Sequence, residues 1–276
     1  MQLLTACARE ATLIMGVLNA TPDSFYAASR AQSVSLAVAA AKDALACGAD
    51  LVDVGGESSR PGAGHVSADG DVAGVVRRLG YLTECDCRPH VDTYRAETAR
   101  RALAAGATMV NDITGLRGDS EMAEAVAESG AECVIMHMLG NPRTMQRDPK
   151  YRDVVGDIRS FFEKQVNVAL SAGVESDKIW LDPGFGFGKT VDHNLELLRR
   201  LDEFTSLGYP LLVGTSNKST IGAVLDLPVE DRQEGTAATV ALAIRNGAAM
   251  VRVHDVKPMA RVVKMTDAIL GKGARG

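Results

Sequence analysis

The sequence lacks long charged or apolar runs, and this excludes several classes of protein. Over 276 residues it has a net charge of −5 and no basic run, which argues against nucleic acid or an anionic membrane as a partner. No apolar stretch reaches the roughly 20 residues of a transmembrane helix. The first ten residues, MQLLTACARE, have neither a basic start nor a long apolar run, so we expect a cytoplasmic protein.

Cysteine is also sparse, and its pattern excludes two kinds of structural support. The five cysteines are Cys7, Cys47, Cys85, Cys87 and Cys133. Their number is odd and their scattered positions fit neither a disulfide framework nor a tetrahedral zinc site. We therefore expect buried or incidental thiols.

The sequence does contain eight short apolar runs that end in glycine or polar residues. They predict strands near residues 12–19, 51–55, 90–93, 109–113, 132–137, 179–183, 210–215 and 250–255. Alanine-rich segments between them, such as LAVAAAKDALACGA and RAETARRALAAGA, have helical apolar spacing and a glycine near the end. Strands that are continuously apolar indicate a parallel sheet covered by helices on both sides. We therefore predict an α/β protein, a (β/α)8 TIM barrel, with residues 1–276 as a single domain.

Polar residues that are unusual for a buried strand stand at or just beyond the ends of these runs. They are Asn19, Asp53, Asp92, Asn111, Asp112, His137, Asp182, Lys218, Arg252 and His254. Any one of them alone is explained as a strand-end cap or a turn residue. In a barrel of this kind, however, the reacting groups project from the carboxyl ends of the strands, so the shared placement predicts a site.

Hydrogen-bond acceptors predominate in this set. Asp92, Asp112 and Asp182 carry carboxylates, and the amide of Asn111 both donates and accepts. Such a set suits a flat heterocycle with amino and ring N–H donors. A metal cluster is the alternative, although the aspartates come without a spaced histidine partner such as H-x-x-x-H.

A second group of residues predicts an oxyanion site. The segment VRVHD places Arg252 and His254 on the same side of a strand. The planar guanidinium of arginine matches phosphate oxygens, so we expect this pair to act with Asn19 and Arg60. The alternative is an internal ion pair between Arg252 and a nearby aspartate.

Two glycine-rich segments, GGESSRPGAG and DPGFGFGKT, have the composition of phosphate-binding loops. The second ends in Gly-Lys-Thr but lacks the Walker A spacing, because Pro183 stands five residues before Gly188. Its two aromatic residues, Phe185 and Phe187, either wall an aromatic ligand or pack beneath it.

Eight motifs, in order and spread from Gly16 to Val256, resemble the successive signatures of the dihydropteroate synthase family. They are MGVLNATPDSF, VDVGGESSRPG, VDTYRAETARRALAAGATMVNDITG, VIMHMLGNPRTMQ, LDPGFGFGKT, HNLELL, VGTSNKS and VRVHDV. The first is shared with pterin-binding methyltransferases, whereas SNKS and RVHD favour the synthase.

The resemblance implies a (β/α)8 enzyme of folate biosynthesis, usually a homodimer and a target of sulfonamides. Such an enzyme joins 6-hydroxymethyl-7,8-dihydropterin pyrophosphate to p-aminobenzoate with Mg²⁺, and releases pyrophosphate and 7,8-dihydropteroate by a dissociative substitution. The residues implied to bind the pterin are Asp92, Asn111, Ile113, Met136, Asp182, Phe187, Gly214, Lys218 and Arg252. Those implied for pyrophosphate are Asn19, Arg60, Arg252 and His254, with Asn19 also a Mg²⁺ ligand. Those implied for p-aminobenzoate are Ser59, Arg60, Pro61, Phe187, Lys218 and Ser219, and the implied catalytic groups are Lys218, Arg252, Asp92 and Asp182.

Two positions depart from the family pattern. Ala27 stands where the family has a mobile-loop aspartate, and Asn217 replaces the arginine of the lysine motif. We hypothesise that either change alters sulfonamide sensitivity; inhibition like that of a typical synthase would contradict this.

Three alternatives to an ordinary synthase stay open from the sequence. A pterin-binding module would deliver methyltetrahydrofolate to a corrinoid partner and ignore p-aminobenzoate. A Schiff-base aldolase would use Lys218 as its nucleophile, although the ring of Asp and Asn suits it poorly. A catalytically weak relative is the third.

Overall fold

The computed structural model describes residues 11–18, 38–55, 76, 79, 88–141 and 144–273. Eight parallel strands pair in sequence order and close into one barrel, with the last strand beside the first. The strands are β1 (Leu13–Val17), β2 (Leu51–Gly55), β3 (Arg88–Asp92), β4 (Met109–Asp112), β5 (Glu132–Met136), β6 (Ile179–Asp182), β7 (Leu211–Val213) and β8 (Ala248–Val253). The predicted (β/α)8 barrel is confirmed.

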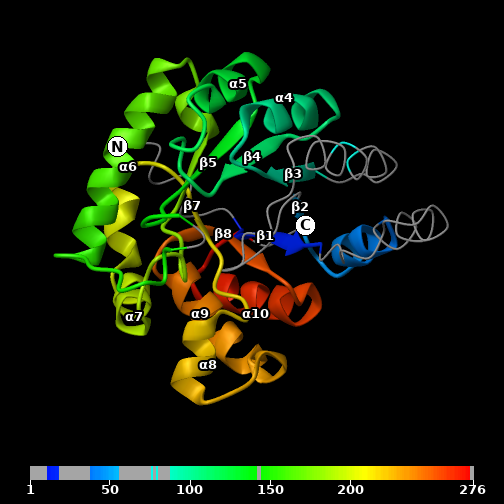
Figure 1. Cartoon of the computed structure of the whole chain (residues 1–276). Coiled ribbons are helices and arrows are strands. Elements are labelled where there is room, and N and C mark those ends of the chain that lie inside the picture. Colours follow the sequence, from blue (N-terminus) through cyan, green and yellow to red (C-terminus); the bar gives the residue numbers. More distant parts are fainter. Residues whose placement is uncertain are drawn as a thin grey trace, which may run out of the picture.

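Helices lie around the outside of this barrel (Figure 1). They are α4 (Ala96–Ala104), α5 (Met122–Ser129), α6 (Val154–Ser171), α7 (Val191–Arg199), α8 (Ser219–Leu225), α9 (Gln233–Arg245) and α10 (Val256–Ile269), and residues 38–46 are also helical. Short 3-10 turns are η1 (Ser176–Lys178), η2 (Leu201–Leu207) and η3 (Val229–Asp231). The prediction of a single domain over residues 1–276 extends beyond the described residues and stays a prediction.

The predicted strand ends lie within two residues of the observed ones. β7 is the most shortened relative to its prediction, because the chain turns after Val213: the N–H of Lys218 donates to the carbonyl of Thr215 at 3.2 Å, and α8 begins at Ser219. The polar residues of this segment therefore belong to a strand-to-helix turn rather than to the strand itself.

Three helix-to-strand junctions repeat the same backbone geometry. Gly48, Gly106 and Gly247 each follow a helix with φ between 101° and 103°, a conformation that favours glycine. Each lies in one of the similar segments ACGADLVDV, AAGATMVND and RNGAAMVRV. The local sequence thus ends each helix and directs the chain into the next strand.

The inside of the barrel has an apolar layer beneath a polar one. The apolar cluster contains Met15, Leu51, Met109, Val134, Leu212 and Met250. Because side chains alternate along a strand, the residues two positions further along also face inward, nearer the carboxyl end. Among these are Asp53, Asn111, Met136, Gly214 and Arg252. The apolar layer therefore fills the base, and the polar layer forms the floor of any site above it.

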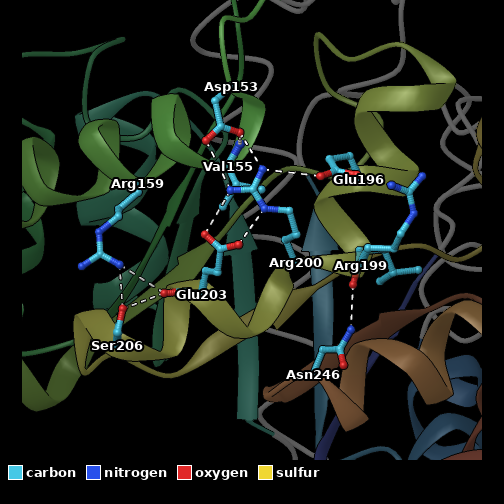
Figure 2. Close-up of polar contacts among 10 residues, drawn as sticks. Asp153, Val155, Arg159, Glu196, Arg199, Arg200, Glu203, Ser206 and Asn246 are labelled. Carbon is cyan, nitrogen blue, oxygen red and sulfur yellow. Dashed lines mark hydrogen bonds and ion pairs between the residues drawn. The ribbon is translucent and has the colours of Figure 1, made fainter.

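The main hydrophobic core lies between the strands and the surrounding helices, with Phe162 and Phe204 among its fully buried residues. At the outer surface, Arg200 joins the start of α6 to the end of α7 and to η2 (Figure 2). Its Nη1 donates to Asp153 at 2.8 Å and its Nε to Glu203 at 2.6 Å. These groups are partly exposed, so the contacts orient the helices more than they stabilise the fold.

The last helix, α10, is also hydrogen-bonded to the start of β1. The carboxylate of Asp267 on α10 accepts from the backbone N–H of Thr12 at 2.8 Å and from its hydroxyl at 2.7 Å. Both residues are buried, so each donor is satisfied where water does not reach.

Candidate functional site

A pocket opens at the carboxyl ends of the strands. It is lined by Asp92, Asn111, Ile113, Met136, Asp182, Gly184, Phe185, Phe187, Gly214, Lys218 and Arg252. All nine residues predicted to bind a pterin are in this set. They come from five strands and from the turns after β4, β6 and β7, so only the closed barrel brings them together. Which ligand they bind stays a prediction.

The floor of the pocket is a buried ion-pair network centred on Asp53. Its carboxylate accepts from Arg252 Nε at 2.8 Å and also contacts Arg252 Nη2. The other carboxylate oxygen lies 2.9 Å from Nδ1 of His90. Arg252 Nη2 is also 3.5 Å from a carboxylate oxygen of Asp92. The internal ion pair considered for Arg252 therefore exists, yet the residue also borders the pocket, so both interpretations apply.

This network sets the protonation of its members. Burial acts to raise the pKa of Asp53, but the positive charge of Arg252 and contact with His90 outweigh it and hold that pKa well below its usual range. Burial and repulsion from Asp53 raise the pKa of Asp92 to about 6. Burial opposes the charge on Arg252, but Asp53 and Asp92 together raise its pKa above the ordinary value. The floor thus carries a fixed cation between carboxylates of unequal acidity.

Two further polar groups extend the acceptor surface. Asn111 is 4% exposed, and its Oδ1 has no hydrogen-bond partner within the described part of the chain. Oδ1 of Asp182 accepts from the backbone N–H of Gly184 at 2.7 Å. Burial raises the pKa of Asp182, an effect that this N–H, Lys218 and Lys189 partly offset. A buried acceptor without a partner is costly, so Asn111 is suited to a ligand that donates a hydrogen bond.

The segment between β6 and α7 forms one wall of the pocket, and its two aromatic residues belong to that wall. Phe185 and Phe187 are both buried and both line the pocket. The Nζ of Lys218 lies 4.2 Å from the centre of the Phe187 ring, at a distance where a cation attracts an aromatic face. Phe187 also belongs to a buried apolar cluster with Met136, Met138 and Met145, so neighbouring side chains support the wall.

Not every predicted site residue reaches this pocket. Ser219 is exposed at the start of α8, and His254 is half-buried beyond β8, where its Nδ1 lies 3.0 Å from Oγ of Ser216. Neither lines the pocket. Asp112 faces elsewhere: it accepts from the N–H and hydroxyl of Thr114 at 2.7 and 2.6 Å, as a strand-end turn residue does.

Several predictions fall on residues outside the described ranges. They are Asn19, Ala27, Ser59, Arg60 and Pro61. Their roles in pyrophosphate, metal and p-aminobenzoate binding stay predictions. Within the described ranges, no group of three or more His, Cys, Asp or Glu side chains is arranged to hold a metal ion.

The prediction missed two buried polar residues. His90 is fully buried on β3, and its Nε2 has no partner among the described residues. Its signal was present, because it lies two positions before Asp92 and so faces the same side of the strand. Lys189 is 3% exposed behind the aromatic wall. Its position in Gly-Lys-Thr suggests a phosphate-binding residue rather than a buried one.

The structure tests part of two expectations: that the cysteines are buried or incidental thiols, and that the chain has no transmembrane helix. Cys133 is buried, Cys47 is half-buried, and both are free thiols. Across the described ranges, every helix is too short or too polar to span a membrane.

Fold and site together define a (β/α)8 barrel with a polar ligand pocket at the carboxyl ends of its strands. The chain belongs to the pterin binding enzyme family, whose model matches residues 15–254. It is 45% identical over 266 residues to the dihydropteroate synthase of Bacillus subtilis, covering 96% of this chain and 91% of that protein. The resemblance drawn from the eight motifs is confirmed.

Solved structures agree with the sequence comparison. The dihydropteroate synthase from Clostridium difficile, solved in the presence of pteroic acid, superposes with a TM-score of 0.88 at 45% identity, covering 95% of this chain and 98% of the other. The enzyme from Thermus thermophilus in complex with 4-aminobenzoate gives a TM-score of 0.84 at 39% identity, covering 94% and 95%. Both matches span nearly the whole chain.

Proposed function

We propose that this chain is a dihydropteroate synthase, which condenses 6-hydroxymethyl-7,8-dihydropterin pyrophosphate with p-aminobenzoate to give 7,8-dihydropteroate and pyrophosphate. One observation carries the proposal: all nine residues that align with the pterin-binding residues of the family border a single pocket at the carboxyl end of the barrel. The confirmed family and the near-complete coverage of synthase relatives support it.

In this proposal the pterin ring lies on the polar floor, with Arg252 stacked on one face. Asp182 and Asp92 accept hydrogen bonds from the amino and ring N–H groups of the pterin. Asn111 Oδ1, which is buried without a partner among the described residues, accepts another. Each of these acceptors is buried, so a hydrogen bond that it makes is little weakened by competing water.

The proposed reaction is a substitution at the methylene carbon that joins the pterin to pyrophosphate. The C–O bond breaks first, and its electron pair leaves with pyrophosphate. The aryl amine of p-aminobenzoate then forms the new C–N bond and loses a proton. The carboxylates of Asp92 and Asp182 favour the positive charge that develops on the pterin. Lys218 donates to the pterin carbonyl and borders the p-aminobenzoate site.

Pyrophosphate departure requires positive charge near the mouth of the pocket. We assign the positive charge to Arg252 and Arg60, and we propose that His254 and Asn19 of the family motifs make further contacts with the pyrophosphate. Mg²⁺ keeps several waters and takes few ligands from a protein when it binds substrate phosphates, so we propose that Asn19 would hold it together with the pyrophosphate. The ion, when bound, neutralises charge on the leaving group.

We place p-aminobenzoate against Phe187, Lys218 and Ser219, next to Ser59, Arg60 and Pro61. Sulfonamides mimic p-aminobenzoate, so we propose that they compete for the same wall. The departure at Asn217 changes local charge here. Its φ is 55°, a conformation that asparagine tolerates, and its carbonyl accepts from Arg232 Nη1 at 3.0 Å.

We further propose a homodimer that acts in the cytoplasm. Exposed large apolar residues on the neighbouring helices α8, α9 and α10 support a second copy as partner; they are Val224, Leu225, Leu242, Met265 and Ile269. Free Cys47 and Cys133 are consistent with a reducing compartment. Sedimentation of the purified chain at about twice the monomer mass of 29.1 kDa is the expected result.

The decisive assay measures pyrophosphate release from the dihydropterin substrate with Mg²⁺, with and without p-aminobenzoate. We expect release that depends on p-aminobenzoate and that is lost in Lys218→Ala but kept in Lys164→Ala, a control on the exposed face of α6. Tight pterin binding with no release would contradict the synthase and favour a binding module. Trapping of a substrate on Lys218 by borohydride would favour an aldolase.

A further inference from the structure

Lys189 is the one lysine within the described ranges that is almost completely buried, and the proposed reaction does not use it. Its Nζ donates to the carbonyl of Gly184 at 2.9 Å and to that of Phe187 at 3.0 Å. It also lies 3.1 Å from Nδ1 of His137, which follows β5. An ammonium group has three N–H donors, so these three contacts satisfy it completely. A fully satisfied buried cation fixes the groups around it.

The partners of Lys189 connect it to the pocket. Gly184 and Phe187 belong to the β6–α7 loop, by which we mean residues 183–190, and both line the pocket. A cation that binds two carbonyls of one loop closes that loop on itself. His137 is buried and makes the third contact from the segment that follows β5. Lys189 therefore fixes both the shape of the β6–α7 loop and its position against β5.

The other residues of Gly-Lys-Thr are accounted for by the fold. Gly188 has a φ of 62° and lies close to Leu139, so a side chain has no room there. Thr190 caps α7: its hydroxyl accepts from the N–H of His193 at 3.1 Å. Neither residue lines the pocket, so Gly-Lys-Thr serves the loop rather than a phosphate.

Charge forms a second link between Lys189 and the pocket. The positive charge of Lys189 lowers the pKa of Asp182, which burial raises. Lys218, on the pocket side, acts on both groups of this pair, and Arg252 also lowers the pKa of Asp182. Burial, with Lys189 and Arg117, keeps the pKa of His137 well below its ordinary value, so its Nδ1 remains an acceptor for the ammonium. Burial lowers the pKa of Lys189 itself to about 7, so the cation is present below neutral pH.

We propose that Lys189 is a positioning residue of the pterin site, which holds the aromatic wall of the β6–α7 loop in place and supplies a positive charge that acts on the carboxylate of Asp182. The inference rests on the proposed function for the identity of the ligand. It does not rest on turnover, because both of its consequences are visible in pterin binding alone.

The test compares Lys189→Met with Lys189→Arg and with the exposed control Lys164→Met. The probe is 6-hydroxymethylpterin, and its Kd is measured by calorimetry between pH 5 and pH 8.5, with the folded fraction taken from circular dichroism. At pH 6.5, where Lys189 is largely charged, we expect the Met variant to bind about tenfold more weakly, because the wall is no longer held. Its affinity should also begin to fall at a higher pH than in the wild type, since Asp182 has lost a nearby cation.

Lys189→Arg keeps the charge, so it should return the acid limb of the affinity profile to the position seen in the wild type, even where packing is imperfect. A purely structural lysine would lower the folded fraction and leave the Kd and its pH profile unchanged. That result in a folded Met variant would overturn the inference. If the Met variant does not fold, His137→Leu removes the third contact from the opposite side, because leucine has no acceptor. A Kd equal to that of the wild type in this variant would overturn the inference equally.

The two proposals fail separately. Suppose that the wild type releases no pyrophosphate with p-aminobenzoate, and that Lys189→Met binds pterin more weakly with a shifted pH profile. These results would contradict the synthase function and support the positioning role. A wild type that binds no pterin at any pH would contradict both proposals.

Discussion

Replacing Gly184 by alanine tests how closely the β6–α7 loop packs against the end of β5. Gly184 has a φ of 68°, in the left-handed region, and its carbonyl is one of the acceptors of Lys189. A side chain at this position would also meet the backbone. An added Cβ would lie 1.9 Å from the carbonyl oxygen of His137, far inside the 3.0 Å below which real contacts are almost never found.

The size of the effect follows from two separate costs. A residue with a Cβ in the left-handed conformation costs about 1–2 kcal/mol. The overlap with His137 adds the cost of overpacking, about 1–3 kcal/mol, because the obstacle is backbone and not a flexible side chain. We therefore expect Gly184→Ala to lower the free energy of unfolding by about 2–5 kcal/mol.

Gly208 provides a matched control for the first cost. Its φ is 84°, and an added Cβ would meet nothing within 4 Å. Gly208→Ala should therefore lower the free energy of unfolding by only about 1–2 kcal/mol and leave pterin affinity unchanged. Urea denaturation measures the first quantity, and calorimetry with 6-hydroxymethylpterin measures the second. Equal destabilisation by the two substitutions, with equal pterin affinity, would refute the packing of the β6–α7 loop that we describe.

Three further predictions concern buried ionisable groups. Asp53→Asn leaves Arg252 without its main partner and should cost about 3–5 kcal/mol in urea denaturation; a loss as small as that of Glu97→Gln, in an exposed pair, would contradict this. Because burial raises the pKa of Asp92 to about 6, pterin affinity should fall as the pH drops through 6 and the carboxylate becomes protonated; a constant Kd in calorimetry from pH 8 to 5 would refute this. Cys133, whose pKa burial raises, should resist iodoacetamide at pH 8 until urea unfolds the chain, as peptide mapping would reveal.

The pKa of Asp92 also has a consequence for stability. Its folded-state pKa is above the ordinary carboxyl value, so folding favours the protonated form. Its contribution to stability is therefore present at low pH and is lost as the pH rises from about 4 to about 6. Asp53 has the opposite sign: its lowered pKa stabilises the fold above the ordinary carboxyl pKa, and this contribution is lost in acid. Two aspartates of one network thus oppose each other across the acidic range.

The sequence alone determined the order of the elements and the identity of most pocket residues. Each apolar run indicates the extent of one strand, and glycines such as Gly106 and Gly247 end helices by a local backbone preference. The predicted strand ends therefore lie within two residues of the observed ones. The polar residues at strand ends, including Asn111 and Asp182, were identified because polar side chains are rare in buried strands. Both properties depend on near neighbours in the chain, and a sequence records these directly.

Only the tertiary structure decided which partners these residues have. Asp53 and Arg252 are 199 positions apart, and no local pattern states that they form an ion pair rather than two separate contacts. The same holds for Lys189, whose acceptor on His137 lies 52 residues away, just after β5. A lysine is written with the same letter in a sequence whether its side chain faces water or three buried acceptors. Closure of the barrel fixes which of these environments it meets, and with it the charge that the pocket presents.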